Sequence, residues 1–156
     1  MDETVYEAAG GAPAMRALAR AWHARCLEDE LTRHPFSHPG QHPDHLERLA
    51  AYWGEQLGGP AVYTGLYGSH GGVLRMHSGN GEHADLDEAA QACFALALDD
   101  AGIPAGLRGL LRDWFRWAVG LMAAHPHDPG AGGLEPPLPR WGWHGPESPS
   151  DPGPER

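Results

Sequence analysis

The chain has 156 residues and a formal net charge of −10, which fits one domain and disfavours nucleic acid or an anionic membrane surface as a partner. Its apolar runs fall short of the roughly 18 residues that a membrane-spanning helix needs, and the acidic start at Asp2 and Glu3 is unlike a signal peptide. Composition and charge therefore predict a soluble, cytoplasmic protein with no nucleic-acid or membrane partner.

Glycine and proline divide the first half of the chain into predicted helices. After a short turn that ends at Gly10-Gly11, a helix is predicted from about residue 13 to 30. The segment 34–43 contains three prolines and a glycine, so it is predicted to be a corner with at most one helical turn. A second helix is predicted from about residue 43 to the strong stop signal Gly58-Gly59-Pro60.

The second half follows the same pattern, except for one irregular stretch. Residues 61–82 are rich in glycine and poorly periodic, so no regular element is predicted there. Helices are predicted over about 85–101 and 104–124, where apolar residues recur every three or four positions. No segment is predicted to form a strand.

The composition changes from Pro126 onward, where proline and glycine dominate. A segment of this kind cannot offset its ordering entropy by burial, so it is predicted to be extended or disordered. Trp141 and Trp143 are the exceptions, because two large aromatic rings could dock back onto the domain. We therefore divide the chain into an all-α domain over residues 1–125 and a Pro/Gly-rich C-terminal tail over residues 126–156.

Histidine and tryptophan are frequent for a chain of this length, with 11 and 6 copies. Histidine is the commonest metal ligand in proteins, and tryptophan supplies large, flat, apolar surface. A flat aromatic cofactor that contains a metal would use both residue types.

His77 is the first candidate ligand. It follows the apolar piece Val73-Leu74-Arg75-Met76 and precedes a glycine-rich run, so its imidazole lies beside a short buried segment and is free to orient toward a cofactor. A haem iron binds one neutral imidazole nitrogen, while a carbonyl or water holds the other N–H. On spacing alone, a surface or helix-capping role is the commoner fate of such a histidine.

His45 and His23 are candidates for contact with a small bound ligand. His45, Leu49 and Trp53 recur at every fourth position of one predicted helix and therefore share a face, which sets a polar nitrogen above an apolar wall. His23 lies next to Trp22, beside the apolar stripe of an earlier helix. The alternative for both histidines is a side chain whose tip reaches water.

A non-haem metal site is an open alternative. His34, His38, His42 and His45 follow one another at intervals of four, four and three residues. The prolines that follow the first three histidines break any helix that would align the side chains, and zinc sites usually recruit cysteine or carboxylate as well. The cluster is therefore a weak signal for a His-cluster metal-binding helical protein.

Four segments carry a resemblance to a known family. The first two are Tyr6-Glu7-Ala8-Ala9-Gly10-Gly11 and Leu27-Glu28-Asp29-Glu30-Leu31. The third is Glu47-Arg48-Leu49 followed by Gly58-Gly59-Pro60, and the fourth is Leu74-Arg75-Met76-His77. In this order and spacing, they resemble a truncated haemoglobin of group II over about residues 5–125.

This resemblance implies the two-over-two helical sandwich of truncated globins, with haem b (iron protoporphyrin IX) between the layers and His77 as the iron ligand. It also implies that the segment before His77 is reduced to a loop and a turn. The implied cofactor contacts are Phe36, His45, Arg48, Leu49, Trp53, Leu74, Met76 and Phe94. The implied distal pocket for a small ligand consists of His23, Phe36, His45, Leu49 and Ala90.

Two positions depart from the family pattern. Group II members usually carry a tyrosine where this chain has His23 and a tryptophan where it has Ala90, and both of those side chains normally donate to the bound ligand. His45 and His23 are the substitute donors here, and the smaller Ala90 leaves more room. Either histidine could instead ligate the iron directly when no small ligand is bound.

The resemblance implies a haem-binding globin that reversibly binds dioxygen or another small ligand, such as NO, CO, sulfide or peroxide, with oxygen transport as one use. The alternative is a haem redox enzyme, either a nitric oxide dioxygenase or a peroxidase-like oxidoreductase. Because the sequence has no flavin- or nicotinamide-binding motif, such an enzyme would need an external reductase. A homodimer is a further assembly that the sequence leaves open.

Overall fold

The computed structural model describes residues 3–36, 43–79, 81–128 and 136–147. Within these ranges the chain is mainly helical, and none of the described helices is both long and apolar enough to span a lipid bilayer. The described elements follow in this order: α1 Val5–Ala9, α2 Gly11–Glu28, α3 Arg33–Phe36, α4 His45–Gln56, α5 Val62–Leu66, α6 His70–His77, α7 Ala84–Asp100, α8 Ala105–Met122, β1 Arg140–Gly142 and β2 Gly145–Glu147.

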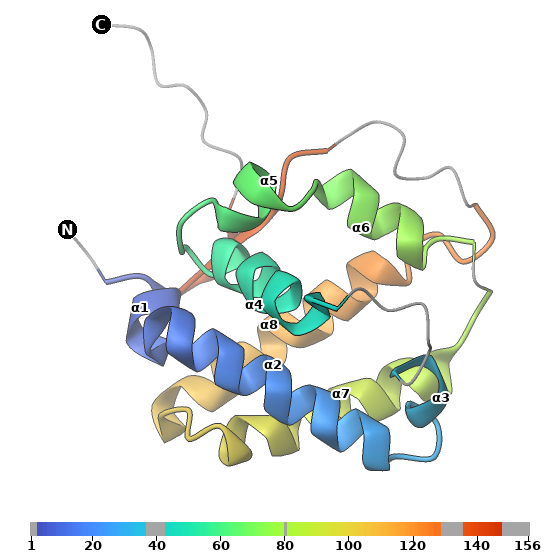
Figure 1. Cartoon of the computed structure of the whole chain (residues 1–156), viewed down its shortest axis with the longest axis horizontal. Helices are drawn as coiled ribbons and strands as arrows, with labels where there is room; N and C mark the ends of the chain where they lie inside the picture. The colour runs from blue at the N-terminus through green and yellow to red at the C-terminus, as the bar shows by residue number, and fades with distance from the viewer. Residues whose placement is uncertain (1–2, 37–42, 80, 129–135, 148–156) are drawn as a thin grey trace, which may run out of the picture.

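The four longest described helices form two layers (Figure 1). Helices α2 and α4 pack against each other and lie in front of α7 and α8 in this view, and α2 also packs on α7. Arg25 in α2 makes a two-pronged ion pair with Asp100 at the end of α7, with N···O distances of 2.6 and 2.8 Å. This arrangement confirms the predicted all-α, two-over-two sandwich.

Aromatic rings fill the space where the layers meet. The ring centroid of Trp53 in α4 lies 5.7 Å from that of Phe94 in α7 and 5.8 Å from that of Trp114 in α8, and all three residues are buried. Phe94 also stacks face to face on Phe115 at 4.0 Å. Because edge-to-face pairs add about 0.5–1.5 kcal/mol each beyond burial, they hold α4 firmly against the rear layer.

The glycine pair that follows α4 lets α1 pack closely against it. Gly58 has a φ of +99°, a left-handed conformation that favours glycine. A Cβ atom on Gly59 would lie 2.7 Å from the carbonyl oxygen of Gly54 and 2.8 Å from the ring of Tyr6, so no larger residue fits there. The N–H of Tyr6 donates to the carbonyl oxygen of Leu57 at 3.0 Å, which ties the start of the domain to the end of α4.

The expectation of no regular element over residues 61–82, and of a loop and a turn before His77, is wrong, because α5 and α6 lie there. Helix α6 begins after Ser69, whose hydroxyl oxygen accepts from the N–H of Gly72 at 3.1 Å, a typical N-cap. His70 and Val73 are buried, and α6 packs against α8. Tertiary packing thus overrides the low helix propensity of the glycines.

A short hairpin in the C-terminal segment corrects the expectation that the chain forms no strand. Strands β1 and β2 pair antiparallel, with Trp141 opposite Pro146. Trp141 is 9 % exposed, and its ring centroid lies 5.3 Å from that of Trp117 in α8. Burial of this indole offsets an ordering entropy that proline and glycine alone cannot offset.

Candidate functional site

A cavity of about 500 Å³ lies among the helices of the two layers and α6. Its volume falls within the range of small-molecule and cofactor sites. Side chains from α4, α6, α7 and α8 provide most of the wall. The lining residues are Trp22, Pro35, Leu49, Tyr52, Trp53, Gln56, Val73, His77, His83, Leu86, Asp87, Ala90, Phe115, Ala118, Val119 and Met122.

The wall is mostly aliphatic and aromatic, with a few polar groups at separate places. Tyr52 and Gln56 come from α4, and His77 comes from the end of α6. Nδ1 of His83 lies 2.9 Å from a carboxylate oxygen of Asp87, and both side chains are partly exposed. An apolar wall with few polar groups suits a flat aromatic cofactor.

His77, the last residue of α6, has the hydrogen bond of a metal-binding histidine. Its Nδ1 lies 2.8 Å from the carbonyl oxygen of Val73, one helical turn earlier. Because a carbonyl oxygen only accepts, Nδ1 carries the ring proton, and Nε2 keeps a lone pair. This tautomer and this orienting bond are what metal-binding histidines usually show. The donor set of the cavity therefore fits an iron-containing cofactor.

The two other predicted histidines, His23 in α2 and His45 at the start of α4, lie against each other. Their ring centroids are 6.2 Å apart in an edge-to-face orientation. Trp22, next to His23, and Leu49, one turn after His45, line the cavity. Burial, and then the neighbouring His23, lowers the pKa of His45, so His45 is neutral at pH 7.

The predicted site residues divide into two groups by position. Those that line the cavity are Leu49, Trp53, His77 and Ala90. The described ones that do not line it are His23, His45, Arg48, Leu74, Met76 and Phe94. Met76 is 67 % exposed, and the guanidinium carbon of Arg48 lies 5.3 Å from the ring centroid of Tyr67. The side chain of Phe36 lies outside the described part of the chain.

Sequence reasoning missed most of the wall that α8 contributes. Phe115, Ala118, Val119 and Met122 line the cavity, and their spacing of three, one and three residues is that of one helix face. A second apolar stripe on the last predicted helix was thus a usable signal. Tyr52 follows the same kind of spacing, because Leu49, Tyr52, Trp53 and Gln56 of α4 are also three, one and three residues apart and all line the cavity.

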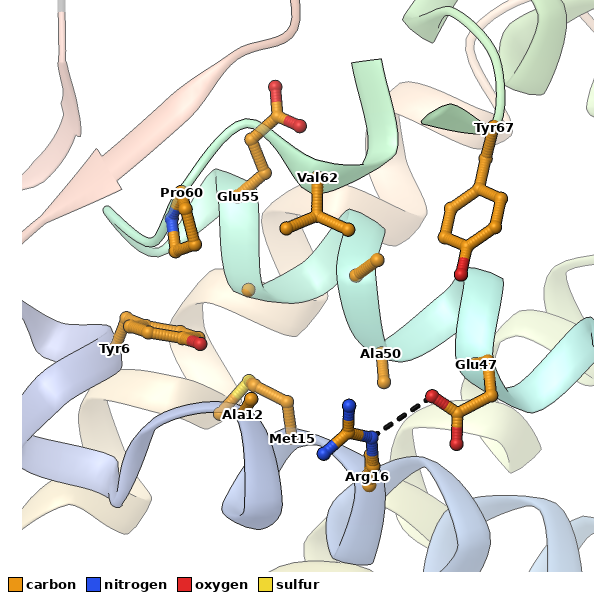
Figure 2. A pocket seen from close by; sticks show the side chains of 12 residues that line it. Tyr6, Ala12, Met15, Arg16, Glu47, Ala50, Glu55, Pro60, Val62 and Tyr67 are labelled. Carbon is orange, nitrogen blue, oxygen red and sulfur yellow. Dashed lines mark hydrogen bonds and ion pairs between the residues drawn. The ribbon is translucent and has the colours of Figure 1, made fainter. Parts of the chain in front are cut away.

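A second hollow, of about 90 Å³, lies between α2, α4 and α5 (Figure 2). Arg16 and Glu47 form an ion pair at its wall, with an N···O distance of 3.0 Å. The carboxylate of Glu55 accepts from the N–H and the hydroxyl of Thr64, at 3.0 and 2.8 Å, so this buried acid already has partners. The hollow is far smaller than the cavity that His77 lines, so the larger cavity fits a flat aromatic cofactor better.

The alternative histidine cluster falls partly outside the described residues, because His38 and His42 belong to the segment 37–42. Among the residues that the structure describes, no group of three or more His, Cys, Asp and Glu side chains is arranged to hold a metal ion.

Comparison with known families decides what kind of helical sandwich this is. The family model of bacterial-like globins matches residues 4–117. The chain belongs to the bacterial-like globin family. It is therefore a haem-binding globin, and the cavity beside His77 is its candidate haem site. Among curated proteins, none matches this globin.

Solved structures similar to this globin include three bacterial haemoglobins. The haemoglobin of Chloroflexus aurantiacus is 26% identical, with a TM-score of 0.66 over 78% of this chain and 98% of that one. The group II 2-on-2 haemoglobin of Agrobacterium tumefaciens is 27% identical, with a TM-score of 0.65 over 78% and 94%. The group II truncated haemoglobin of Bacillus anthracis, at 20% identity, shares the fold with a TM-score of 0.68 over 84% and 98%. These similarities confirm the resemblance to group II truncated haemoglobins.

Proposed function

We propose that this globin holds haem b in the cavity between its helical layers, with Nε2 of His77 as the protein ligand to the iron. The observation that carries the proposal is the hydrogen bond of 2.8 Å between Nδ1 of His77 and the carbonyl oxygen of Val73. It leaves the other ring nitrogen unprotonated at the wall of a cofactor-sized cavity. Leu49 and Trp53 line the same cavity and supply apolar contact.

The function that follows is reversible binding of dioxygen or another small ligand, such as NO, CO, sulfide or peroxide. Haem supplies an iron centre that binds such ligands and exchanges electrons. Leu49 and Ala90 line the cavity and limit the access of water. His45 and His23 do not line it, so neutral His45, or His23 as the second candidate donor, has to turn an N–H toward the cavity to hold the ligand. A hydrogen bond to a ligand that carries negative charge contributes about 1.5–3 kcal/mol.

A redox activity, as a nitric oxide dioxygenase or a peroxidase-like enzyme, is the second candidate function. It is favoured by the buried pair Tyr52 and His70, whose hydroxyl oxygen and Nδ1 are 2.6 Å apart at the cavity wall. Such an activity needs an external reductase or another electron donor. A cytoplasmic location and a homodimeric assembly are further parts of the proposal, which cell fractionation and light scattering test.

Replacement of His77 by alanine tests the proposed iron ligand. We expect the purified protein to show a Soret band, and His77→Ala to lose most of its haem or to show a changed spectrum that free imidazole restores. The matched control is His127→Ala, since His127 is exposed and does not line the cavity. Haem content and the absorbance spectrum of both variants are the measurements.

An unchanged spectrum and haem content in His77→Ala would mean that another group holds the iron, and the assignment would be wrong. A protein that takes up no haem on reconstitution would remove the proposed function itself. Tight zinc or copper binding in its place would favour the histidine cluster.

A further inference from the structure

A buried tyrosine–histidine pair lies beside the cavity, and its tyrosine forms part of the wall. The hydroxyl oxygen of Tyr52 in α4 lies 2.6 Å from Nδ1 of His70, the first residue of α6. Both residues are 5 % exposed, and Tyr52 also lines the cavity. A phenol thus borders the cofactor site and, through its hydroxyl, contacts a base that is shielded from water.

Burial keeps both partners of the pair neutral. It raises the pKa of Tyr52 and lowers the pKa of His70, because a dry environment disfavours the charged form of either group. The phenol therefore keeps its proton at neutral pH, and in the tautomer whose ring proton lies on Nε2 it donates to the bare Nδ1 of the imidazole. Since 2.6 Å is short for a hydrogen bond, the phenolic proton can pass to Nδ1 without any rearrangement.

Neighbouring aromatic side chains have partners of a different kind. Trp22, which also lines the cavity, donates its indole N–H to the carbonyl oxygen of Ala90 at 3.0 Å. Trp114 donates to the side-chain oxygen of Gln56 at 3.0 Å. These oxygens accept a hydrogen bond but take up no proton near neutral pH, whereas an imidazole does. An aromatic side chain loses one electron more easily when a nearby base can accept its O–H or N–H proton. Tyr52 has such a base in His70.

We propose that Tyr52 is a one-electron donor to the cofactor of this cavity, and that His70 is the positioning residue that takes up the phenolic proton. The inference rests on the proposed haem-binding function and deepens it, because it assigns a reaction with hydrogen peroxide to the same site.

The oxidant in this reaction is hydrogen peroxide. It is reduced to two molecules of water by two electrons from the protein, with two protons taken from solvent. Tyr52 supplies one of the electrons, and the other comes from the haem group. The O–H bond of Tyr52 breaks, and its proton forms an N–H bond at Nδ1 of His70. The products on the protein are a neutral phenoxyl radical and an imidazolium. A small phenolic reductant from solution returns one electron to the phenoxyl radical, and the proton on Nδ1 of His70 moves back to the phenoxyl oxygen. A second molecule of the reductant returns the other electron to the haem group, and both reductant molecules release their protons to solvent.

Electron paramagnetic resonance of the ferric holoprotein, frozen within seconds of peroxide addition, tests this inference. The absorbance spectrum is recorded first, so that a Soret band establishes that haem is present. We expect a radical signal with the hyperfine pattern of a tyrosine ring, which narrows when the protein contains ring-deuterated tyrosine. Tyr52→Phe abolishes the signal. The control Tyr63→Phe retains it, although the Tyr63 ring lies only 5.1 Å from that of Tyr52.

His70→Gln separates proton uptake from packing, because glutamine accepts a hydrogen bond but takes up no proton at neutral pH. We expect the tyrosine radical to form more slowly in this variant, on the order of a hundredfold, with the Soret band unchanged. If Tyr52→Phe is too unstable to purify, deuterated tyrosine and His70→Gln decide the question.

A tryptophan-type radical, a tyrosine signal that survives Tyr52→Phe, or an equal rate in His70→Gln would each overturn the inference. A Soret band with no tyrosine radical overturns it while the proposed function stands. A protein without a Soret band removes both.

Discussion

By the resemblance, His23 stands where group II truncated haemoglobins usually carry a tyrosine donor, and His45 lies against it. The rings of His23 and His45 are 6.2 Å apart, and burial together with the neighbouring His23 lowers the pKa of His45. A neutral imidazole has one N–H and one bare nitrogen, so neutral His45 has a single N–H to donate. Ligand retention should therefore depend on whichever ring turns its N–H toward the ligand.

His45→Leu tests that dependence. We expect dioxygen to dissociate from the reduced holoprotein about tenfold to hundredfold faster, because a hydrogen bond to a charged acceptor is worth about 1.5–3 kcal/mol. Stopped-flow displacement of dioxygen by carbon monoxide measures the rate. Leucine fills a similar volume to histidine but has no N–H, so packing changes little.

His23→Leu is the companion variant. A fast rate in His23→Leu with a normal rate in His45→Leu would transfer the donor role to His23. Normal rates in both variants would mean that neither imidazole holds the ligand.

At the scale of single residues, the sequence pointed to His77 because a resemblance assigned its place, and the bond to Val73 agrees with that assignment. Leu49, Trp53 and Ala90 also line the cavity. The pairing of Tyr52 with His70 was not foreseeable, because His70 lies on a helix that the sequence did not predict. A contact between two helices can be predicted only when the position of both helices is known. The spacing of apolar residues predicts one helix at a time and says nothing about which helices pack together.

Helix α6 is the element on which the proposed cofactor site depends most, since it carries both His70 and His77 in eight residues. It holds two glycines, and the side chain of Ser69 caps its N-terminus. Ser69→Ala removes that cap at a cost of about 1 kcal/mol. We expect haem to be lost about fivefold faster, as that energy implies. Transfer of haem to an excess of apomyoglobin gives the rate.

Thr4→Ala is the matched control for that experiment. Thr4 caps α1 by the same type of bond, in which its hydroxyl oxygen accepts from the N–H of Glu7 at 3.1 Å, but α1 contributes no residue to the cavity wall. Thr4→Ala should lower stability without faster haem loss. Equal haem loss in both variants would mean that global stability, and not α6, controls the site.

Long helices with an apolar stripe were predictable, whereas α5 and the strands of the C-terminal hairpin were not. The helix predicted over about 85–101 is Ala84–Asp100, and that over about 104–124 is Ala105–Met122. Each spans several turns, so its periodicity is visible in the sequence alone. Helix α5 has five residues and each hairpin strand has three, which is too few for a period. These elements form because the rest of the molecule offers a surface to pack on.

At the scale of the whole molecule, the two ends of the described chain meet. Trp143 donates its indole N–H to the carbonyl oxygen of Glu3 at 2.8 Å, and β1 packs against α4. Trp141 packs on Trp117 of α8. The hairpin therefore contacts the front layer, the rear layer and the N-terminal segment. These contacts connect the two layers and should stabilise their packing.

The two tryptophans of the hairpin should contribute unequally to stability. Trp141 is 9 % exposed and Trp143 is 44 % exposed, so Trp141→Ala removes a buried ring, at a cost of about 3 kcal/mol or more. Trp143→Phe keeps an aromatic ring and removes one hydrogen bond, at a cost of about 1 kcal/mol. Urea denaturation of the holoprotein, followed by circular dichroism, measures both. Equal, small losses would show that the hairpin does not dock in solution, whereas a large loss for Trp141→Ala alone means that the segment after residue 125 is part of the folded unit.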